Sequence, residues 1–488
     1  MSEKQPSRPN LIFMMPDQLR ADFLGCYGAE FLKTPNIDRL AQKGVRYSRA
    51  YSCHPVCVPA RAALLTGMNA LRNGVMDNGQ WLRPNLADSG VHTWPELLSN
   101  GGYYTARVGK MHFYPWYITH GFQYRSAAED KRWIKVRDEY YHHLRAHGER
   151  KYHGNEHDGY HENKGAIINR LPWELSTDHF VGEEACRFIR TYGNDGPYAM
   201  MVGFPGPHCP YDPNAEWLDR IDPDAMPDAI PENPVNASQL RQSNIEGNKG
   251  AWNGVDYTEF TDAQKRKIRT HYAASVEQID YEVGQILEAL EEAGQLENTI
   301  IIFASDHGDY LGDHNLIGKG TFYEASIHVP MIVNVPGADG GVVNDQLVQL
   351  TDVMATLLAF GGVALPGYID SQPLPGLGLD SESSHGHLYG IVTGGWMVFD
   401  GRWKLCKYAT GEQHLFDLQE DPTEQHNRLQ DPAVADIRLE LDTLLTQEIM
   451  RSASLAFEER RVYTGNSMWN DDVFGREAWV RAYPQPLE

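Results

Sequence analysis

Short apolar runs followed by polar residues recur along the chain and restrict it to one class of fold. We expect strands at residues 11–15, 103–110, 198–204, 299–305 and 331–335. Short, nearly continuous apolar runs are typical of buried parallel strands. Residues 272–290 instead carry an apolar residue every three to four positions, the pattern of an amphipathic helix. Strands that alternate with helices predict an α/β fold, in which a mostly parallel central sheet is flanked by helices.

A change of composition predicts a domain boundary near residue 375. Residues 363–385 are rich in Pro, Gly and Ser, and they separate a large domain, 1–375, from a smaller one, 376–488. Runs at 396–399, 403–408 and 414–418 predict antiparallel strands, and a helix is expected at about 432–450. The smaller domain is therefore expected to be α+β, built on a short antiparallel sheet, and to end in a tail that covers a surface or a neighbouring molecule.

Charge and hydropathy exclude several classes of partner. No apolar run approaches the roughly 18 residues that span a bilayer, and the run at 11–15 is too short for a signal-peptide core. We therefore expect a cytoplasmic protein that does not bind a membrane. A net charge of −23 argues against nucleic acid as a partner. It does not exclude a small anionic substrate, because a local cluster of cations outweighs a diffuse surface charge.

Polar residues gather where the predicted strands end. In a parallel sheet, ligands bind beyond the carboxyl ends of the strands. The residues at these ends are Asp17, Gln18, Lys110, His112, His208, Asp306 and His307. Carboxylate and amide oxygens suit Ca²⁺ or Mg²⁺, and an imidazole shifts the expectation towards Mn²⁺. Either acidic pair alone would be a loop acid beside a capping residue, but two pairs at equivalent positions favour a metal site.

The pentapeptide Cys57-Val58-Pro59-Ala60-Arg61 opens a predicted helix. Proline is tolerated in a first turn, so Cys57 is expected at a helix N-terminus, where the amide dipoles favour negative charge. Such a position lowers a thiol pKa or binds an anion. Pairing with Cys53 in a zinc or redox site is an alternative. The other cysteines are scattered, as expected of small buried hydrophobic residues.

Several cations accompany this cysteine in the sequence. Arg61, Lys110 and Lys319 carry fixed positive charge, and His112 and His208 can exchange protons near neutral pH. Together with a metal they would bind a tetrahedral oxyanion and stabilise charge on a leaving oxygen. Taken singly, each would be an ordinary surface charge.

At this point the sequence resembles the type I sulfatases of the alkaline phosphatase superfamily. The pentapeptide is similar to their maturation signature, and further matches cover about residues 10–112, 180–215, 265–360 and 388–430. These matches are Asp17-Gln18-x-Arg20-x-Asp22, Gly25-Cys26-Tyr27-Gly28, Thr34-Pro35-Asn36-Ile37-Asp38, Leu65-Thr66-Gly67, Gly109-Lys110-Met111-His112, Pro207-His208-x-Pro210, Ser305-Asp306-His307-Gly308, Gly312-Asp313-His314, Gly318-Lys319, Leu415-Phe416-Asp417-Leu418 and Asp421-Pro422-x-Glu424.

The resemblance implies an alkaline phosphatase-like catalytic domain over 1–375 and a hydrolase that cleaves sulfate monoesters. In this family a separate formylglycine-generating enzyme oxidises the cysteine to formylglycine, an aldehyde that hydrates to a diol. One hydroxyl attacks sulfur and forms a covalent sulfo-enzyme, and the other then loses its proton and expels sulfate.

The resemblance also implies roles for individual residues. Asp17, Gln18, Asp306 and His307 would bind one divalent metal together with residue 57. Arg61, Lys110 and His112 would hold the diol, with His112 as the base. Lys319 and His208 would contact the sulfate and protonate the leaving oxygen.

The chain departs from the family pattern at three positions. Ala60 replaces the usual Ser, and Gln18 and His307 replace the commoner Asp and Asn. A site with fewer charges favours Mn²⁺ over Ca²⁺, and the expected metal is one of these two rather than Mg²⁺. The Gln18/His307 pairing is also similar to phosphonate monoester hydrolases, whereas Lys110 and His112 are similar to sulfatases. The alternatives are therefore a phosphonate monoester or phosphodiester hydrolase, and an unmatured sulfatase-like binding protein.

Residues 113–178 match nothing in this family and are rich in Tyr and His. A solvated insertion or a metal-binding tract would explain them, but we expect a substrate lid, because loops above strand ends usually select the substrate. The expected substrates are small aryl or carbohydrate sulfates. The tail makes a homo-oligomer plausible.

Overall fold

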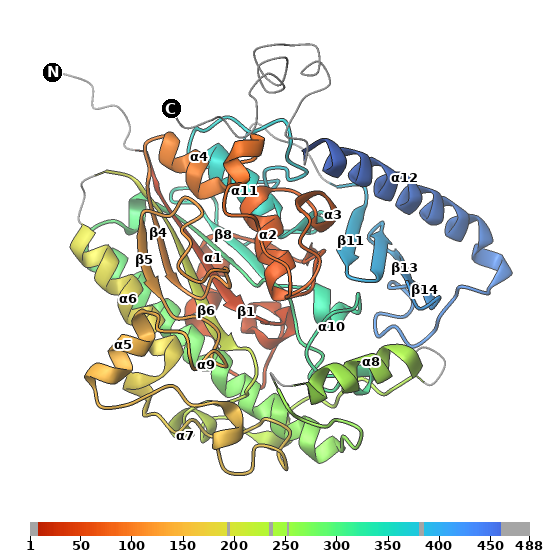
Figure 1. Ribbon diagram of the computed structural model, residues 1–488, viewed down its shortest axis with the longest axis horizontal. Coiled ribbons are helices and arrows are strands. Elements are labelled where there is room, and N and C mark those ends of the chain that lie inside the picture. Colours follow the sequence, from red (N-terminus) through yellow and green to blue (C-terminus); the bar gives the residue numbers. More distant parts are fainter. Residues whose placement is uncertain (1–7, 193–195, 234–237, 251–252, 380–384, 460–488) are drawn as a thin grey trace, which may run out of the picture.

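The computed structural model describes residues 8–192, 196–233, 238–250, 253–379 and 385–459. Its centre is an eight-stranded sheet with the order β5-β4-β6-β1-β7-β8-β2-β9 (Figure 1). All neighbouring pairs are parallel except those made by β8, which runs antiparallel to β7 and β2. The predicted α/β class with a mostly parallel sheet is therefore confirmed.

The strands of this sheet are β1 (Asn10–Asp17), β2 (Val45–Tyr47), β4 (Tyr104–Gly109), β5 (Tyr124–Ala127), β6 (Tyr198–Pro207), β7 (Thr299–Ala304), β8 (Met331–Asn334) and β9 (Val342–Asn344). A separate two-stranded pair joins β3 (Ala50–Tyr51) to β10 (Val348–Gln349). The predicted strand at 11–15 extends to Asp17, which brings that carboxylate onto the end of the strand itself.

Both faces of the sheet are covered, as the alternation along β1 shows. Ile12 and Met14 belong to one apolar core with helices α1, α6 and α9, whereas Leu11, Phe13 and Met15 belong to a second core with α2, α4 and α11. Successive side chains of a strand point to opposite faces, so a strand buried on both sides is apolar throughout. Figure 1 shows the two helical layers on either side of the strands.

The helices are α1 (Pro35–Lys43), α2 (Cys57–Thr66), α3 (Ala70–Asn73), α4 (Trp94–Asn100), α5 (Glu139–Ala146), α6 (Thr177–Tyr192), α7 (Ala215–Leu218), α8 (Ser238–Lys249), α9 (Asp262–Glu292), α10 (Glu324–Ile327), α11 (Asp352–Phe360) and α12 (Ala435–Glu459). Helix α9 begins well before the predicted start at 272. Thr261 and Gln264 form a reciprocal capping box at its true N-terminus. Its first turns bury polar side chains such as Arg269 and His271. A search for apolar periodicity therefore could not identify these turns as helical.

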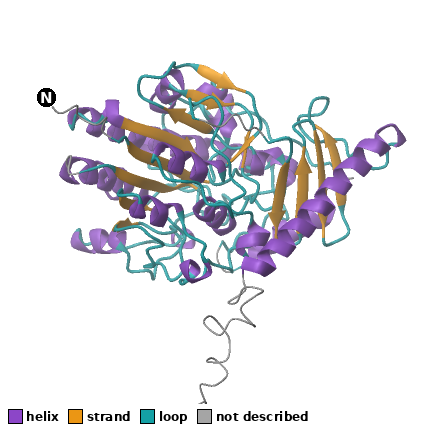
Figure 2. Cartoon of the chain, turned by 90° about the horizontal axis from the view of Figure 1, so that it is seen from above, coloured by secondary structure: helices purple, strands orange, loops and turns teal. Residues whose placement is uncertain are grey.

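The C-terminal part is a four-stranded antiparallel sheet with one long helix across it (Figure 2). Its strands are β11 (Leu388–Val392), β12 (Gly395–Phe399), β13 (Trp403–Tyr408) and β14 (Gln413–Asp417). Three of these were predicted, and β11 was missed. The helix predicted at 432–450 is α12, and it extends to Glu459. The predicted tail lies mostly outside the described residues, and the boundary at 375 stays a prediction.

A buried ion cluster joins the C-terminal sheet to the main body. Lys404 of β13 is fully buried, and its Nζ lies 2.7 Å from a carboxylate oxygen of Glu324 and 2.7 Å from one of Glu424. Glu324 is the first residue of α10 and follows Lys319 closely in the chain. The C-terminal sheet is therefore bonded to a loop of the main body.

Part of the predicted lid belongs to the main sheet. Residues Tyr124–Ala127 form β5, which pairs in parallel with β4 at the sheet edge. Only the remainder of 113–178 is connecting structure around α5. The predicted substrate lid can therefore consist only of the remaining residues, of which those near the end of β5 are the important ones.

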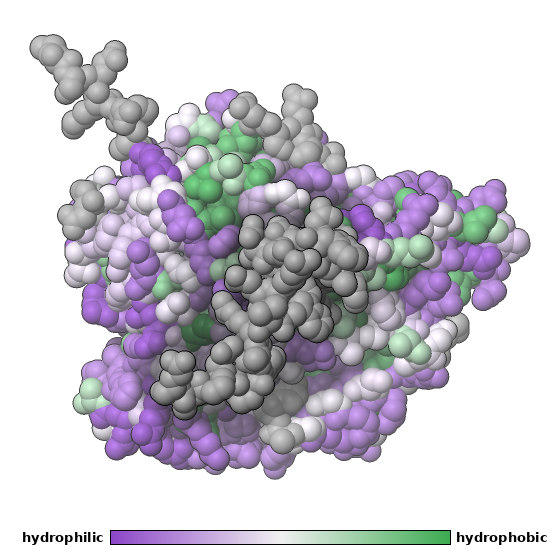
Figure 3. All heavy atoms as spheres, turned by 45° about the horizontal axis from the view of Figure 1, so that its top comes forward, coloured by the Kyte–Doolittle hydropathy of each residue, from purple (hydrophilic) through white to green (hydrophobic). Residues whose placement is uncertain are grey.

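The face of the molecule in Figure 3 is mainly hydrophilic, with small apolar areas scattered over it. Among the described residues, none of the helices combines the length and the apolar character that crossing a bilayer requires. The cytoplasmic location stays a prediction.

Candidate active site

Two neighbouring strands carry the acidic residues of the site. β1 ends at Asp17, and Asp306 and His307 come one residue after the end of β7, its parallel neighbour. Ligand atoms of Asp17, Cys57, Asp306 and His307 all lie within 4.8 Å of one another, and all four residues are buried. His307 Nε2 lies 3.2 Å from Cys57 Sγ, which lies 3.7 Å from Asp17 Oδ1. Such a set of donors can hold a divalent metal.

Cys57 is the first residue of α2, as the position of Pro59 predicts. Its side chain is wholly buried. Burial disfavours the thiolate, but Lys319, His307 and Lys110 outweigh this effect and hold the pKa of the Cys57 thiol well below its usual value. Cys53 lies elsewhere, in an apolar cluster of the described residues, where burial raises its pKa. Cys53 is therefore a packing residue, not a partner of Cys57.

Arg61 and Lys110 bind the carboxylates of Asp17 and Asp306. Arg61 donates to Asp17 over 3.0 Å and to Asp306 over 2.9 Å, and also to the carbonyl oxygen of Lys110 over 2.7 Å. The Lys110 ammonium lies 2.8 Å from Asp17. Burial opposes charge on Lys110, yet its carboxylate neighbours raise its pKa above the usual value. Both cations are almost inaccessible to solvent, so the network is rigid.

Lys319 and His208 form a second group beside the first. Lys319 Nζ lies 2.7 Å from His208 Nε2. His208 Nδ1 lies 2.6 Å from the carbonyl oxygen of Cys209, so Nδ1 carries the proton and Nε2 accepts from the lysine. Burial, and then Lys319 and Arg132, lower the pKa of His208 to about 3, which keeps the imidazole neutral.

Gln18 connects the two groups. Its backbone N–H donates to Asp306 over 2.9 Å. Its side-chain amide accepts from Lys319 and donates to Asp309. The structure therefore brings Gln18 beside the carboxylate of Asp306, with its side chain bonded to Lys319 and Asp309. Its predicted role as a ligand stays a prediction.

His112 lies at the end of β4 in a left-handed conformation, with φ 59°. Its backbone N–H donates to Glu129 over 2.9 Å, and its ring packs edge-on against Trp133, with centroids 4.8 Å apart. Within the described part of the chain its Nδ1 is buried without a hydrogen-bond partner. Burial is the main cause that lowers the pKa of His112, so the ring is held in its basic, neutral form.

Sequence reasoning missed Asp130, which follows β5. Asp130 accepts from Lys110 over 2.8 Å and holds Arg132 in a two-pronged contact, with both distances 2.6 Å. The rule that found the other site residues, polar groups after strand ends, also applies to Asp130. It failed because four residues, Tyr124–Ala127, without a continuous apolar run were not recognised as a strand.

Asp313 and His314 do not join the site. Asp313 accepts from Arg20 over 2.6 Å and also pairs with Arg269. The His314 ring stacks on Tyr323, with centroids 4.0 Å apart. Both residues hold loops together.

A cavity of about 800 Å³ opens beside this candidate site, and His112 and Lys319 belong to its wall. Several aromatic side chains from 113–178 line it as well. This size is typical of pockets that bind small molecules.

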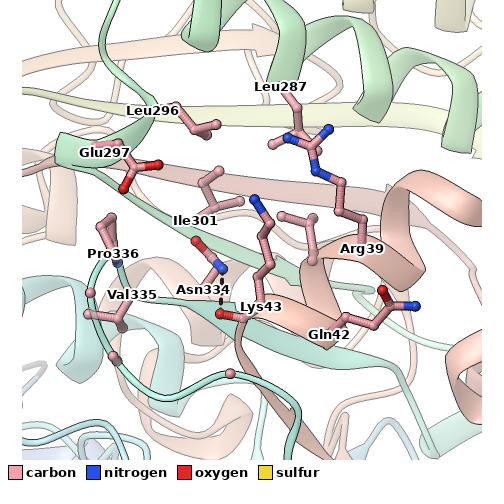
Figure 4. A pocket seen from close by; sticks show the side chains of 14 residues that line it. Arg39, Gln42, Lys43, Leu287, Leu296, Glu297, Ile301, Asn334, Val335 and Pro336 are labelled. Atoms are coloured by element: carbon pink, nitrogen blue, oxygen red, sulfur yellow. Dashed lines mark hydrogen bonds between the residues drawn. The ribbon is translucent and has the colours of Figure 1, made fainter.

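A second cavity of about 410 Å³ lies at the other end of β7 (Figure 4). Leu296 and Glu297, which precede β7, line it together with Arg39 and Lys43 of α1. Asn334 donates to the Lys43 carbonyl oxygen over 2.8 Å in its wall. It contains none of the predicted site residues.

Comparison with protein families gives matches along nearly the whole chain. A model described as Sulfatase matches residues 9–363, and one described as N-sulphoglucosamine sulphohydrolase, C-terminal, matches residues 312–451. An arylsulfatase from Clostridium perfringens is 32% identical over 456 residues, 86% of this chain and 90% of that protein. A choline-sulfatase from Rhizobium meliloti is 27% identical over 463 residues, 87% of this chain and 83% of that protein.

Solved structures share the fold. The phosphonate monoester hydrolase of Agrobacterium radiobacter superimposes with a TM-score of 0.77 at 23% identity, covering 91% of this chain and 96% of that one. A protein solved with its substrate D-glucosamine-2-N,6-O-disulfate gives 0.70 at 21% identity, covering 93% and 100%. At these sequence identities the structural similarity shows the alkaline phosphatase-like fold alone.

Proposed function

This chain belongs to the sulfatase family and is a sulfuric ester hydrolase, and we propose that it cleaves sulfate monoesters with residue 57, matured from Cys57 to formylglycine. The observation that carries the proposal is the place of Cys57. It is the first residue of α2, buried between two carboxylates and a set of cations. A hydrated aldehyde there would offer one hydroxyl to attack sulfur and a second through which sulfate is expelled.

The donor set fits a divalent metal, for which we propose Ca²⁺ or Mn²⁺. Asp17, Asp306 and His307 would hold it with residue 57, and Gln18 would take part from beside them. The pKa of Asp306 is raised by burial and then by the neighbouring Asp17, so the negative charges of these two carboxylates repel each other. When bound, the metal would supply the positive charge that lowers the proton affinity of a hydroxyl at residue 57.

Residues of the chain supply the remaining steps. Lys319 and His208 would bind the sulfate, and the Lys319 ammonium would give a proton to the alcohol oxygen as its bond to sulfur breaks. Neutral His112 would then take the proton of the second hydroxyl while sulfate departs and the aldehyde re-forms. Arg61 and Lys110 would hold the carboxylates and residue 57 in place. Water would restore the diol.

Replacing the nucleophile tests the proposal directly. We expect Cys57→Ala to lower turnover of an aryl sulfate at least about 10⁴-fold, because no other group offers the two hydroxyls. The thermal unfolding midpoint should stay close to that of the unaltered protein. Retained turnover in the folded variant would refute the role of residue 57.

The first alternative is a phosphonate monoester or phosphodiester hydrolase that uses the same groups. Lys110 and His112 support the sulfatase, because they lie beside residue 57. Comparison of kcat/KM for one aryl leaving group on sulfate and on a phosphonate separates the two. We expect the sulfate ester to dominate, and a dominant phosphonate rate would overturn the proposal.

The second alternative is an unmatured binding protein, for which Ala60 in the maturation signature is the reason. Peptide mass spectrometry across Cys57, on protein from its own host, is expected to give the mass of formylglycine. An unmodified thiol together with absent turnover would favour the binding protein. A formylglycine-generating enzyme is the partner that the proposal requires.

The substrates we propose are small aryl or carbohydrate sulfates. Relatives named arylsulfatase and N-acetylglucosamine-6-O-sulfatase support both classes. Association into a homo-oligomer stays a prediction.

A further inference from the structure

The cavity beside His112 and Lys319 determines which alcohol the enzyme releases. We propose that it receives the leaving group and selects a flat aromatic ring, with a negatively charged substituent favoured over a positively charged one. This inference rests on the proposed function, since it assumes that the ester is cleaved at residue 57. It narrows the substrates to aryl sulfates.

The walls of the cavity suit an aromatic ring. Trp81 and Tyr114 line it as a pair, with ring centroids 4.8 Å apart. Trp133 also lines it and packs against His112, which ties the aromatic wall to a catalytic group. Aromatic pairs gain energy beyond the apolar area that they bury. Hydroxyl groups of a sugar that face these aromatic walls would lose water without gaining partners, since the polar side chains of the lining serve only part of its surface.

The charges at the cavity determine the second preference. Arg132, Lys135 and Lys319 line it, and none of its described lining residues is a carboxylate. Asp130 fixes the Arg132 guanidinium through its two-pronged contact. Lys135 is exposed and forms no ion pair with any residue that the structure describes. This local excess of cations contrasts with the net charge of −23 of the whole chain.

The balance of charge disfavours a quaternary ammonium group, although aromatic walls alone would attract one. A cationic leaving group would approach Lys135, whose charge no ion pair with a described residue compensates, whereas Asp130 already pairs with Arg132 and Lys110. An anionic substituent would be attracted by the same residues, and a cleft lined by one sign of charge concentrates the opposite sign.

Three phenyl sulfates that differ at the para position test the selection. We expect kcat/KM, corrected for leaving-group acidity, to be highest for the carboxylate, lower for the methyl and lowest for the trimethylammonium compound. Adjacent members should differ by about three- to tenfold, as expected for partly solvated charges. N-acetylglucosamine 6-sulfate should fall below all three. A cationic ester equal to the anionic one, or a sugar sulfate above the neutral ester, would overturn the inference.

Variants assign the effect to residues. Lys135→Gln should remove most of the advantage of the carboxylate by raising its KM, with little change for the methyl compound. Arg137→Gln is a matched control, because Arg137 is exposed on the same segment and does not line the cavity. Trp81→Leu should lower kcat/KM of every phenyl ester about tenfold, and Trp81→Phe should restore most of it. Unchanged rates in Lys135→Gln and Trp81→Leu would contradict the assignment.

The same leaving groups on phosphonate esters separate this inference from the proposed function. Hydrolysis of phosphonates alone, with the expected order of leaving groups, would refute the sulfatase and support the selection by the cavity. Hydrolysis of sulfates without that order would support the sulfatase and refute the selection.

Discussion

Lys110 illustrates how single residues are held in place in this site. Its ammonium lies 2.8 Å from Asp17 and 2.8 Å from Asp130, and all three side chains are buried. Asp130 also fixes Arg132, so one carboxylate orients both Lys110 and an arginine that lines the cavity beside His112. We regard Asp130 as a positioning residue that acts through these two cations.

Removing this carboxylate should therefore affect both stability and the substrate. For Asp130→Asn we expect the free energy of unfolding to fall by about 3 kcal/mol, because the partly buried Arg132 loses its two-pronged partner and the buried Lys110 keeps only Asp17. Denaturant unfolding measures this loss.

A purely structural role would leave the order of substrates unchanged in the surviving folded protein. We expect instead that the preference among para-substituted phenyl sulfates shrinks, because Arg132 is no longer fixed. Asp130→Glu should recover part of it. An unaltered preference in Asp130→Asn would contradict the positioning role.

At the scale of elements, α1 depends on a helix far away in the sequence. The Asp280 carboxylate of α9 accepts from the backbone N–H groups of Asn36 over 3.0 Å and Ile37 over 2.8 Å. It thus does for the first turn of α1 what an N-cap side chain usually does. The local cap residue, Thr34, makes no such bond.

Asp280→Ala should consequently destabilise the protein by about 1–2 kcal/mol, the usual cost of losing a cap. Denaturant unfolding at neutral pH checks this value. Glu288→Ala, on an exposed turn of the same helix, is the control and should change stability by no more than about 0.5 kcal/mol. Equal effects of the two substitutions would rule out the cap.

The elements that could be predicted are those whose pattern is local. β1 and β7 are continuous apolar runs, and Pro35 and Pro59 mark helix starts that the structure contains. Strands β2, β5 and β9 of the main sheet were missed because they are short and depend on pairing with their neighbours. Strand β11 is as long as β12, but Gly390 interrupts its apolar run. The site follows the same division. Its strand-end residues could be predicted, whereas Asp130 depends on a pairing that no local pattern reveals.

At the scale of the whole molecule, two sets of buried ionisable groups change the stability in opposite directions as the pH falls. Burial lowers the pKa of several histidines to about 4, while it raises the pKa of several glutamates to about 7, so the two sets affect acid stability in opposite directions. The histidines are His54, His120, His271 and His314, and the glutamates are Glu129, Glu282 and Glu424. A single variant isolates one contribution.

His120 is the suitable one, since it lies outside the site and its pKa is lowered to about 4 by burial and then by Arg107. The unfolded chain takes up this proton near pH 6.5 and the folded protein only near 4. Stability from this residue is therefore lost as the pH falls through that window, by about 3 kcal/mol in all.

We expect the stability difference between the unaltered protein and His120→Asn to change in favour of the variant from pH 6.5 to pH 4. Denaturant unfolding at several pH values measures it. His142→Asn, at an exposed position, is the control. A difference that does not depend on pH would contradict the prediction.

The proposed metal should also act on the molecule as a whole. Chelation should abolish turnover and lower the thermal midpoint, and Mn²⁺ or Ca²⁺ should restore both. At a hundredfold excess over Kd the gain in stability is about 2.7 kcal/mol. In Asp306→Asn the midpoint should no longer respond to metal. A midpoint and turnover indifferent to chelator would argue against a site formed by Asp17 and Asp306.

The complete burial of Cys57 determines the order of two events, the oxidation of its thiol and the folding of the chain. The exposed fraction of Cys57 is 0%. The residue lies at the N-terminus of α2, beside Arg61 and the two carboxylates that Arg61 binds. If a second enzyme oxidises this thiol, it must reach it while the polypeptide is still open, because in the finished structure no active site of another protein can enter. Maturation and folding would then compete as two rates. A chain that folds first would be permanently inactive although correctly folded, so the yield of active enzyme would depend on how long the nascent chain stays unfolded.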